Sequence, residues 1–487
     1  MKDITLIIMA AGDSVRFCNS MIKDTPHINS MDSHNTLHHN ETRIMESTNK
    51  PSTKKQWLRL GTTPLWYFVT QNLASQIIEI CNTLQQTSNI AYYKDYHDTK
   101  CNNKQSETNL DTPTNIQHSS DTQNLTRFSY NQTPLKKIII TASPKDISYM
   151  QKLISNTLYF TIENKAYAIP LQIVCGGNTR FQSLKNAVQH VESTHIIVND
   201  CARFNTKRHV LHNLLSSFMN DDFDCIVPYL QVSDTTLHYD SYMNTHSAIP
   251  RENLKLIQTP QITKTKKILE SFTKEVDFSD ESSAICALKS PKIGFVVGSK
   301  DMAKLTYYDD LHLLKKLYHA NAHTRHDTLI GHGSDIHGFI DSKDMYLCGV
   351  KIESHFGFKA HSDGDVAIHA IIDSILGAMN YGDIGELFPD NKEEFKDIDS
   401  KILLKEVYEY CLSVGLEITN LDVTIIAQTP RISPYKAQMQ ETLAHILYLP
   451  KMCINIKAST AESLGFIGRK EGVLANSIVQ LRARKFH

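Results

Sequence analysis

The 487-residue sequence has no apolar stretch near the roughly 18 residues that a membrane-spanning helix needs. Its ten cysteines include no Cys-x-x-Cys pair and form no dense framework, so a disulfide scaffold is not expected and reduced thiols in the cytoplasm are favoured. Neither sign of charge is in excess, because 51 Lys and Arg residues nearly balance 52 Asp and Glu residues. A global basic surface for nucleic acid is therefore not expected, and any anionic ligand must be held by local charges.

Length and composition together predict more than one domain, since roughly 150 residues per domain is usual. Two segments, near 18–53 and 97–134, are rich in Asn, Ser, Thr, His and Gln and poor in apolar residues. We interpret them as flexible insertions, although the histidines of the first could also form a metal-binding tract. The opening "MKDITLIIMAAG" is expected to be a buried strand and a turn, not a signal peptide.

Outside the insertions the pattern is that of an α/β protein. Short apolar runs such as "ITLIIMAA", "LKKIIITAS" and "THIIVND" alternate with helical stretches. This alternation predicts a mostly parallel sheet covered on both faces, with ligands at the carboxyl ends of its strands. We expect a Rossmann-like first domain over 1–318, a polar linker over 319–327, and a second α/β domain over 328–487.

The turn after the first strand suits a phosphate group. Ala10, Ala11 and Gly12 let a ligand come close to the backbone, and the helix expected to follow, with Arg16 at its start, offers free N–H groups. Alone, the same pattern also describes a plain tight turn. Further motifs follow it in order: "KKQWLRLGTTPLW" (54–66), "GGNTRFQSLKNAV" (176–188), "NDCARF" (199–204), "SDTT" (233–236), "RENLKLIQTPQ" (251–261), "FSDES" (278–282) and "GSKDMAKLTYYDDL" (298–311).

This series resembles the 2-C-methyl-D-erythritol 4-phosphate cytidylyltransferase family of the non-mevalonate isoprenoid pathway. The resemblance implies transfer of CMP from CTP to 2-C-methyl-D-erythritol 4-phosphate with release of pyrophosphate. Arg16 and Lys55 would stabilise charge at the α-phosphate, and Asp200 would hold Mg²⁺ or Mn²⁺. The other implied contacts are to the nucleotide (Ala10, Ala11, Gly12, Gly177, Asn178, Ser183 and Arg203) and to the sugar phosphate (Thr235, Arg251 and Lys304, the first two in a neighbouring subunit's site).

Several positions depart from that family's usual pattern. Ser14 stands where the family has a second glycine, and Asn178, Cys201, Phe204 and Met302 replace an aspartate, an alanine, a proline and an asparagine. The first insertion also separates Arg16 from Lys55. Each basic residue could be a solvated surface charge without the motif context. Two alternatives therefore stay open: a first domain that only binds or scaffolds, and nucleotidyl transfer to a different sugar phosphate.

A metal-binding pattern marks the second domain. Asp335 and His337 are two residues apart, so a strand can point both the same way, and His369 projects from the helical stretch "DVAIHAIIDSIL". One carboxylate and two imidazoles suit a catalytic zinc ion with an open fourth position. The alternative interpretations are that a lone histidine on such a helix is a satisfied hydrogen-bonding partner and not a ligand, that "SDGD" is a helix N-cap, and that "GDIG" is a turn.

The motifs "IGHGSDIHGF", "HSDGDVAIHAIIDSILGAMNYGDIGELFPD", "FKDIDSKILL", "DVTIIAQTPRISPY" and "IKASTAESLGFIGRKEG" resemble the 2-C-methyl-D-erythritol 2,4-cyclodiphosphate synthase family. The resemblance implies a phosphorus–oxygen lyase in which the 2-phosphate of 4-diphosphocytidyl-2-C-methyl-D-erythritol 2-phosphate attacks the β-phosphate and expels CMP. It implies Zn²⁺ on Asp335, His337 and His369 and a second divalent ion, Mg²⁺ or Mn²⁺, on Glu462. His361 and Thr460 would stabilise the transition state. The implied substrate contacts are Ser362, Asp383, Ile384, Gly385, Ala427, Pro430, Arg431, Ser459, Glu462, Phe466 and Arg469, although an aromatic such as Phe466 after a glycine is usually a packing residue.

The two implied reactions are not consecutive, because an ATP-dependent kinase acts between them. The sequence has neither a Gly-x-x-x-x-Gly-Lys-[Ser/Thr] loop nor a glycine-serine-rich kinase loop. We therefore expect a bifunctional enzyme that could associate with a separate kinase. The two resemblances imply dimers for the first domain and trimers for the second, so we also expect a homo-oligomer with dimeric and trimeric contacts.

Overall fold

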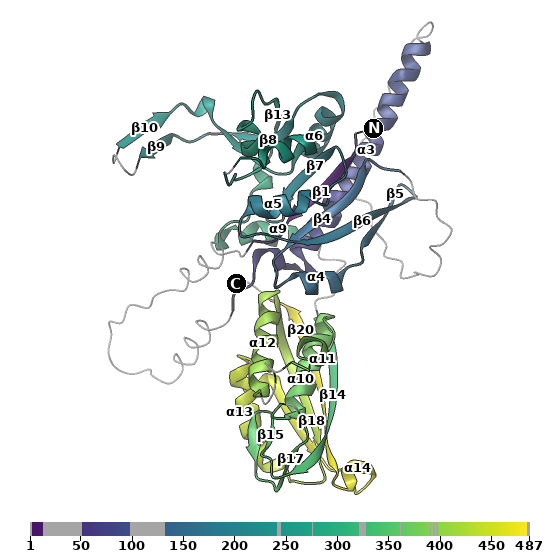
Figure 1. Cartoon of the computed structure of the whole chain (residues 1–487), viewed down its shortest axis with the longest axis vertical. Coiled ribbons are helices and arrows are strands. Elements are labelled where there is room, and N and C mark those ends of the chain that lie inside the picture. The colour runs from purple at the N-terminus through teal and green to yellow at the C-terminus, as the bar shows by residue number, and fades with distance from the viewer. Residues whose placement is uncertain are drawn as a thin grey trace. The chain divides into compact units, whose positions relative to one another are not determined.

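The computed structural model describes residues 2–12, 51–97, 132–240, 245–274, 276–320, 328–360, 362–389, 391–392, 395 and 398–484. It divides into two compact units (Figure 1). The first unit is Met1–Gly12, Val69–Ile147 and Ser155–Ala303, and the second is Asp13–Phe68, Ser148–Ile154 and Lys304–His487. Most of the two expected insertions, together with Arg16, Ser14 and His361, lies outside the described residues. No described helix is both long enough and apolar enough to span a membrane.

A nine-stranded mixed sheet forms the centre of the first unit, in the order β11-β8-β12-β7-β1-β4-β6-β5 with β13 beside β8. The strands are β1 (Ile4–Met9), β4 (Leu135–Ala142), β5 (Thr157–Ile162), β6 (Lys165–Cys175), β7 (His195–Asp200), β8 (Cys225–Gln231), β11 (Lys255–Ile257), β12 (Gln261–Lys264) and β13 (Ile293–Val297). The middle strands β7, β1, β4 and β6 are parallel, as the sequence predicts. The flanking strands β5, β11 and β12 pair antiparallel with their neighbours.

Helices cover this sheet because its central strands are apolar on both faces. Ile7 and Ile139 pack in one core with Leu184 of α5 and Ile285 of α8. Their chain neighbours on β1 and β4 point to the other face and are equally buried. The helices with residues in the first unit are α3 (Leu65–His97), α4 (Ile147–Leu153), α5 (Arg180–Val188), α6 (Arg208–Asn220), α7 (Thr265–Ser271) and α8 (Glu281–Cys286).

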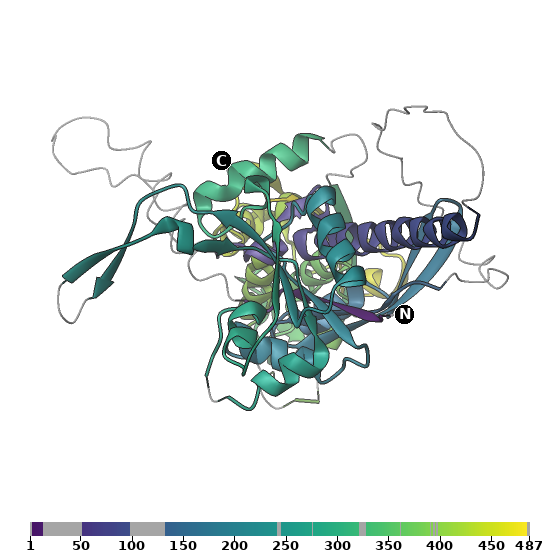
Figure 2. The ribbon, with the colours of Figure 1, turned by 90° about the horizontal axis from the view of Figure 1, so that it is seen from above.

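A two-stranded arm, β9 (Thr236–Asp240) and β10 (Thr245–Ile249), projects away from the sheet of the first unit in both views (Figures 1 and 2). Its side chains Leu237 and Tyr239 are more than half exposed. This arm is not predicted from the sequence, because each strand has only five residues and β10 lacks the alternation of apolar and polar residues that β9 shows.

A five-stranded sheet in the order β17-β14-β20-β18-β19 forms the second unit. Its strands are β14 (Thr328–Asp341), β17 (Phe356–Phe358), β18 (Leu416–Ile426), β19 (Ile454–Ser459) and β20 (Gly472–Ala483). Beside it stand the hairpin of β15 (Met345–Leu347) and β16 (Val350–Ile352), and the helices α10 (Val366–Met379), α11 (Ile384–Leu387), α12 (Ser400–Ser413), α13 (Lys436–Ile446) and α14 (Gly465–Gly468). Helix α9 (Leu311–Ala320) is counted with the same unit. The outward positions of β14 and β20 expose isoleucines, namely Ile330, Ile336, Ile340 and Ile478.

The second unit also includes residues 51–68 and 148–154, which the sequence analysis assigned to the first domain by their place in the chain. The Thr53 hydroxyl donates to the carbonyl oxygen of Leu412 at 3.0 Å, and the Tyr149 hydroxyl donates to that of Met379 at 2.9 Å. Trp57 stacks on Tyr149 with ring centroids 5.2 Å apart. Buried aromatic rings and satisfied hydroxyls therefore hold these segments in the second unit.

Candidate active sites

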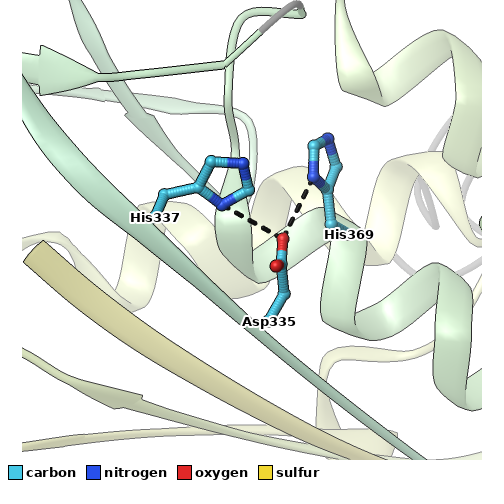
Figure 3. Close-up of side chains that lie close together, drawn as sticks. All are labelled: Asp335, His337 and His369. Atoms are coloured by element: carbon cyan, nitrogen blue, oxygen red, sulfur yellow. Dashed lines mark hydrogen bonds and ion pairs between the residues drawn. The ribbon is translucent and has the colours of Figure 1, made fainter. Parts of the chain in front are cut away.

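Three side chains from β14 and α10 meet in the second unit (Figure 3). Alternation along β14 turns Asp335 and His337 toward α10, while Ile336 between them points to the outer face. His369 lies in the first turn of α10.

Two glycines of β14 make this meeting possible. A Cβ atom on Gly331 would lie 1.9 Å from the carbonyl oxygen of Ser374, and one on Gly333 would lie 2.0 Å from that of Ala370. Only glycine at these positions lets the backbone of α10 lie directly against the strand. The sequence "IGHGSDIHGF" thus supplies both the ligand side chains and the close approach that brings His369 to them.

The Asp335 carboxylate lies between the two imidazoles. Its Oδ2 is 3.1 Å from Nδ1 of His337 and 3.2 Å from Nδ1 of His369, and the ring centroids are 5.2 Å apart. Burial by itself would raise the pKa of Asp335, but the two imidazoles outweigh burial and hold that pKa below its ordinary value. Burial would lower the pKa of His369, yet the neighbouring carboxylate outweighs it and raises that pKa.

The donor set fits a divalent cation. The candidate ligand atoms of the three residues all lie within 4.8 Å of one another. Nδ1 of His337 is buried, and its close polar contact among the described residues is with Oδ2 of Asp335 at 3.1 Å. A cation bound by one oxygen and two nitrogen donors would satisfy that atom and neutralise the carboxylate. The structure therefore brings together the three residues that the sequence predicted as metal ligands.

Helix α10 also positions the segment expected to hold the erythritol portion. Asp383 caps α11 by accepting from the backbone N–H of Glu386 at 3.0 Å, and the N–H of Ile384 donates to Asp373 at 2.8 Å. Asp373 follows His369 by one helical turn. The segment from Asp383 to Gly385, which is the cap and the start of α11, is thereby tied to the helix that carries His369. Sequence reasoning missed Asp373, because a single carboxylate within an apolar helix gives no motif.

A second group of predicted residues gathers at the parallel ends of β18 and β19, where Ile426 pairs with Ser459. The N–H of Ala427 donates to the carbonyl oxygen of Ser459 at 3.0 Å, and the Thr460 hydroxyl donates to Glu462. Thr460 and Glu462 are exposed. Pro430 and Arg431 follow on the segment after β18. Phe466 lies in α14, and Arg469, directly after that helix, forms an ion pair with Glu471 at 2.7 Å.

In the first unit, the predicted nucleotide residues meet at the carboxyl edge of the parallel strands. Met9 pairs with Asp200, so the end of β1 and the end of β7 lie side by side. A Cβ on Gly176 would be 2.3 Å from the Cβ of Ala11, which shows how closely the turn of Ala10, Ala11 and Gly12 approaches the segment after β6. The location is the usual one for ligands of such sheets.

The loop before α5 is held by its own helix. The N–H of Gly177 donates to the Ser183 hydroxyl at 2.9 Å, and the N–H of Asn178 donates to Oε1 of Gln182 at 3.0 Å. Thr179 caps the helix by accepting from the N–H of Gln182 at 3.1 Å. The positions of Gly177, Asn178 and Ser183 are therefore fixed relative to one another by the sequence of the motif.

A buried charge cluster orients Asp200. Nε of Arg180 donates to Oδ1 of Asp200 at 2.9 Å, and its two terminal nitrogens donate to Glu281 at 2.8 and 3.2 Å. Glu281 is fully buried. Burial works against the charge of Arg180, but the two carboxylates outweigh it and raise the pKa of this guanidinium. Arg180 and Glu281 belong to the motifs "GGNTRFQSLKNAV" and "FSDES", but the sequence alone indicated no role for either residue.

Arg203 lies beside this cluster, with its guanidinium donating to the carbonyl oxygens of Met302 at 2.7 Å and Ile257 at 3.4 Å. Burial lowers its pKa, opposed in part by Asp200. Thr235 and Arg251 lie at the base of the arm, where Arg251 donates to the carbonyl oxygen of Ser233 at 2.8 Å. Two further cationic residues predicted for this site, Lys55 and Lys304, are counted with the second unit.

Comparisons with known proteins give the same two parts. A family model described as 2-C-methyl-D-erythritol 4-phosphate cytidylyltransferase matches residues 112–318, and one described as the YgbB family matches residues 328–482. The protein named bifunctional enzyme IspD/IspF in Aliarcobacter butzleri is 35% identical over 99% of this chain and 98% of its own length. Its namesake in Campylobacter jejuni subsp. jejuni is 36% identical with the same coverage. A solved structure of the bifunctional IspDF from Campylobacter jejuni, 33% identical, covers 99% of this chain and 98% of its own with a TM-score of 0.67.

Proposed function

The chain belongs to the bifunctional IspD/IspF family, and from this membership we propose how its own residues divide the family's two reactions. It is a bifunctional enzyme of non-mevalonate isoprenoid precursor biosynthesis. One activity transfers CMP from CTP to 2-C-methyl-D-erythritol 4-phosphate and releases pyrophosphate. The other cyclises 4-diphosphocytidyl-2-C-methyl-D-erythritol 2-phosphate to the 2,4-cyclodiphosphate and releases CMP.

For the cytidylyl transfer, the turn of Ala10, Ala11 and Gly12 accepts the triphosphate and Asp200 holds Mg²⁺. Bound there, the ion would neutralise phosphate oxygens as pyrophosphate leaves. Arg16 and Lys55 stabilise the charge that develops at the α-phosphate. Gly177, Asn178, Ser183 and Arg203 contact the nucleotide, and Thr235, Arg251 and Lys304 position the sugar phosphate. The pairing of Met9 with Asp200 supports this division, because it places the glycine turn beside the carboxylate.

For the cyclisation, the observation that carries the proposal is the convergence of Asp335, His337 and His369 within one cation's reach. Zn²⁺ held there would act as a Lewis acid on a phosphate oxygen and make the phosphorus atom more open to attack. Glu462 holds a second divalent ion, and Thr460, which donates to Glu462, stabilises the transition state together with His361. Ser362 and the start of α11 from Asp383 to Gly385 grip the erythritol portion. The segment from Ala427 to Arg431 and Ser459 line the cytidine side, and Phe466 and Arg469 contribute to phosphate binding.

The competing reading of the first domain as a scaffold is tested by pyrophosphate release. The purified chain is given CTP, Mg²⁺ and 2-C-methyl-D-erythritol 4-phosphate, with Asp200→Ala as the control. Release that disappears in the control supports a working site. If a preparation with an active cyclase releases no pyrophosphate, the proposed cytidylyl transfer is wrong. Release only with a different sugar phosphate would favour nucleotidyl transfer to that other substrate.

We extend the proposal to assembly and location. The exposed isoleucines of β14 and β20 supply a sheet face for trimeric contacts, and the arm of β9 and β10 supplies a dimeric one. The eight described cysteines are free, which suits the reducing cytoplasm. The separate kinase would associate with this assembly. Light scattering of the chain mixed with that kinase tests the association, and unchanged masses in the mixture would rule it out.

A further inference from the structure

The two ring nitrogens of His369 face different surroundings. Nδ1 points to Oδ2 of Asp335 at 3.2 Å, on the side where His337 also lies (Figure 3). Nε2 points the other way and lies 3.1 Å from the hydroxyl of Ser400 and 3.3 Å from that of Ser362. The imidazole therefore bridges the candidate metal site and the beginning of α12.

The hydrogen of the Ser400 hydroxyl has a fixed destination. Its Oγ is 2.5 Å from Oδ1 of Asp363, and an ionised carboxylate can only accept. Ser400 thus donates to Asp363 and presents a lone pair to His369. Nε2 of His369 must then carry its proton and donate it to Ser400. The Ser362 hydroxyl could reverse this arrangement only by donating to Nε2 across the longer distance, and that would leave the lone pair of Ser400 facing another lone pair.

Backbone contacts hold this relay, the hydrogen-bonded series Asp363–Ser400–His369, in place from both ends. Asp363 also accepts from the N–H of Ser400 at 3.2 Å and from the N–H of Asp365 at 3.2 Å. Asp399 caps α12 by accepting from the N–H of Lys401 at 2.9 Å. Ser400 is fully buried. The motif "FKDIDSKILL" thus holds the Ser400 hydroxyl in one position against His369.

We propose that Ser400 and Asp363 are positioning residues for the metal site, acting through His369 without touching metal or substrate. The chain Asp363–Ser400–His369 keeps the proton on Nε2 and leaves the Nδ1 lone pair facing the cation. A ligating histidine commonly donates the N–H of its second ring nitrogen to a carboxylate, and here a serine hydroxyl lies between the imidazole and the carboxylate. This inference rests on the proposed metal site at Asp335, His337 and His369.

The test is zinc affinity of the full chain, measured by competition with a chromophoric chelator after removal of bound metal. Ser400→Ala should weaken zinc binding about 10-fold to 100-fold, the usual effect of losing such a partner. Ser400→Thr, which keeps the hydroxyl, should restore most of the affinity. The matched control is Ser374→Ala, because Ser374 is an equally buried serine on α10 that bonds Ile371 and Ser477 and not His369.

Asp335→Ala distinguishes an error in the proposed metal site from an error in the positioning role. It also measures the zinc that binds elsewhere on the chain. If zinc binding survives in Asp335→Ala, the proposed metal site itself is wrong. If it is lost there while Ser400→Ala binds zinc within twofold of Ser374→Ala, only the positioning role is wrong. Should Ser400→Ala fail to fold, Asp363→Asn serves instead, since it keeps the shape and removes the charge, and unchanged zinc affinity in that variant would overturn the inference.

Discussion

Single residues decide how each site holds its charge. In the first unit, the carboxylate of Asp200 is held by Arg180, which is itself held by the fully buried Glu281. Removing Arg180 would leave Glu281 as a buried unpaired charge, at a cost of about 3–5 kcal/mol of stability. Substitution of Glu281 by its isosteric amide avoids that unpaired charge and is therefore the cleaner probe.

Glu281→Gln should raise the Mg²⁺ concentration needed for half-maximal pyrophosphate release by about 10-fold, because Arg180 loses the partner that fixes its approach to Asp200. The measurement is a Mg²⁺ titration of the first activity. Cyclase turnover of the same preparation is the internal control and should not change. A Mg²⁺ dependence equal to that of the unaltered chain would show that the Arg180–Glu281 pair does not position Asp200.

His195, at the start of β7, gives a pH-dependent stability. Burial, with Lys2 and Lys264 nearby, lowers its pKa from 6.5 to about 4. The unfolded chain therefore binds a proton between these values that the folded chain does not, and stability falls as pH drops from 6.5 toward 4. His195→Gln should lose less stability than the unaltered chain between pH 7 and pH 5, as measured by urea unfolding. Equal losses in both proteins would contradict the depressed pKa.

At the scale of elements, the packing of α10 on β14 builds the metal site. Gly333→Ala should destabilise the second unit by about 1–3 kcal/mol and weaken zinc binding, because the added methyl group meets the carbonyl oxygen of Ala370. Gly377→Ala is the matched control on α10, since a Cβ atom there would lie an ordinary 3.8 Å from the carbonyl oxygen of His332. Thermal denaturation and zinc titration of both variants check this. Gly333→Ala behaving like Gly377→Ala would mean that the close approach is not needed.

The elements also show what the sequence could predict. The continuous apolar runs of β1, β4 and β7 predicted buried parallel strands, and the Asp-x-His spacing of β14 placed two side chains on one face. Antiparallel β12 was not distinguishable, because a buried strand reads the same in either direction. The relay through Ser400 could not be predicted either, since it joins the loop before α10 to the start of α12 across 37 residues of chain.

At the scale of the whole molecule, assembly should depend on the outer face of the second sheet. Ile330 is 71% exposed in the single chain, far more than an isoleucine on a folded sheet usually is. Ile330→Lys should lower the molar mass measured by light scattering, because a charge replaces apolar contact between copies. Ile402→Lys, the same substitution at an exposed isoleucine of α12, is the control. An unchanged mass for Ile330→Lys would place the contact elsewhere.

One chain holding two non-consecutive activities should not complete the pathway segment by itself. Given CTP, 2-C-methyl-D-erythritol 4-phosphate, Mg²⁺ and Zn²⁺, the chain should accumulate the cytidylylated product and form no cyclodiphosphate. Addition of ATP and the separate kinase should start cyclodiphosphate formation, followed by mass spectrometry. Cyclodiphosphate formed without the kinase would contradict the assignment of the two reactions.

The most direct measurement of the central claim is a crossed assay of the full chain with Asp200→Ala and Asp335→Ala. Pyrophosphate release is measured with the substrates of the first reaction, and CMP release with the substrate of the second. The account predicts that Asp200→Ala loses pyrophosphate release and keeps CMP release, and that Asp335→Ala does the opposite. Loss of both activities in either folded variant, or of neither, would contradict two separate active sites on one chain.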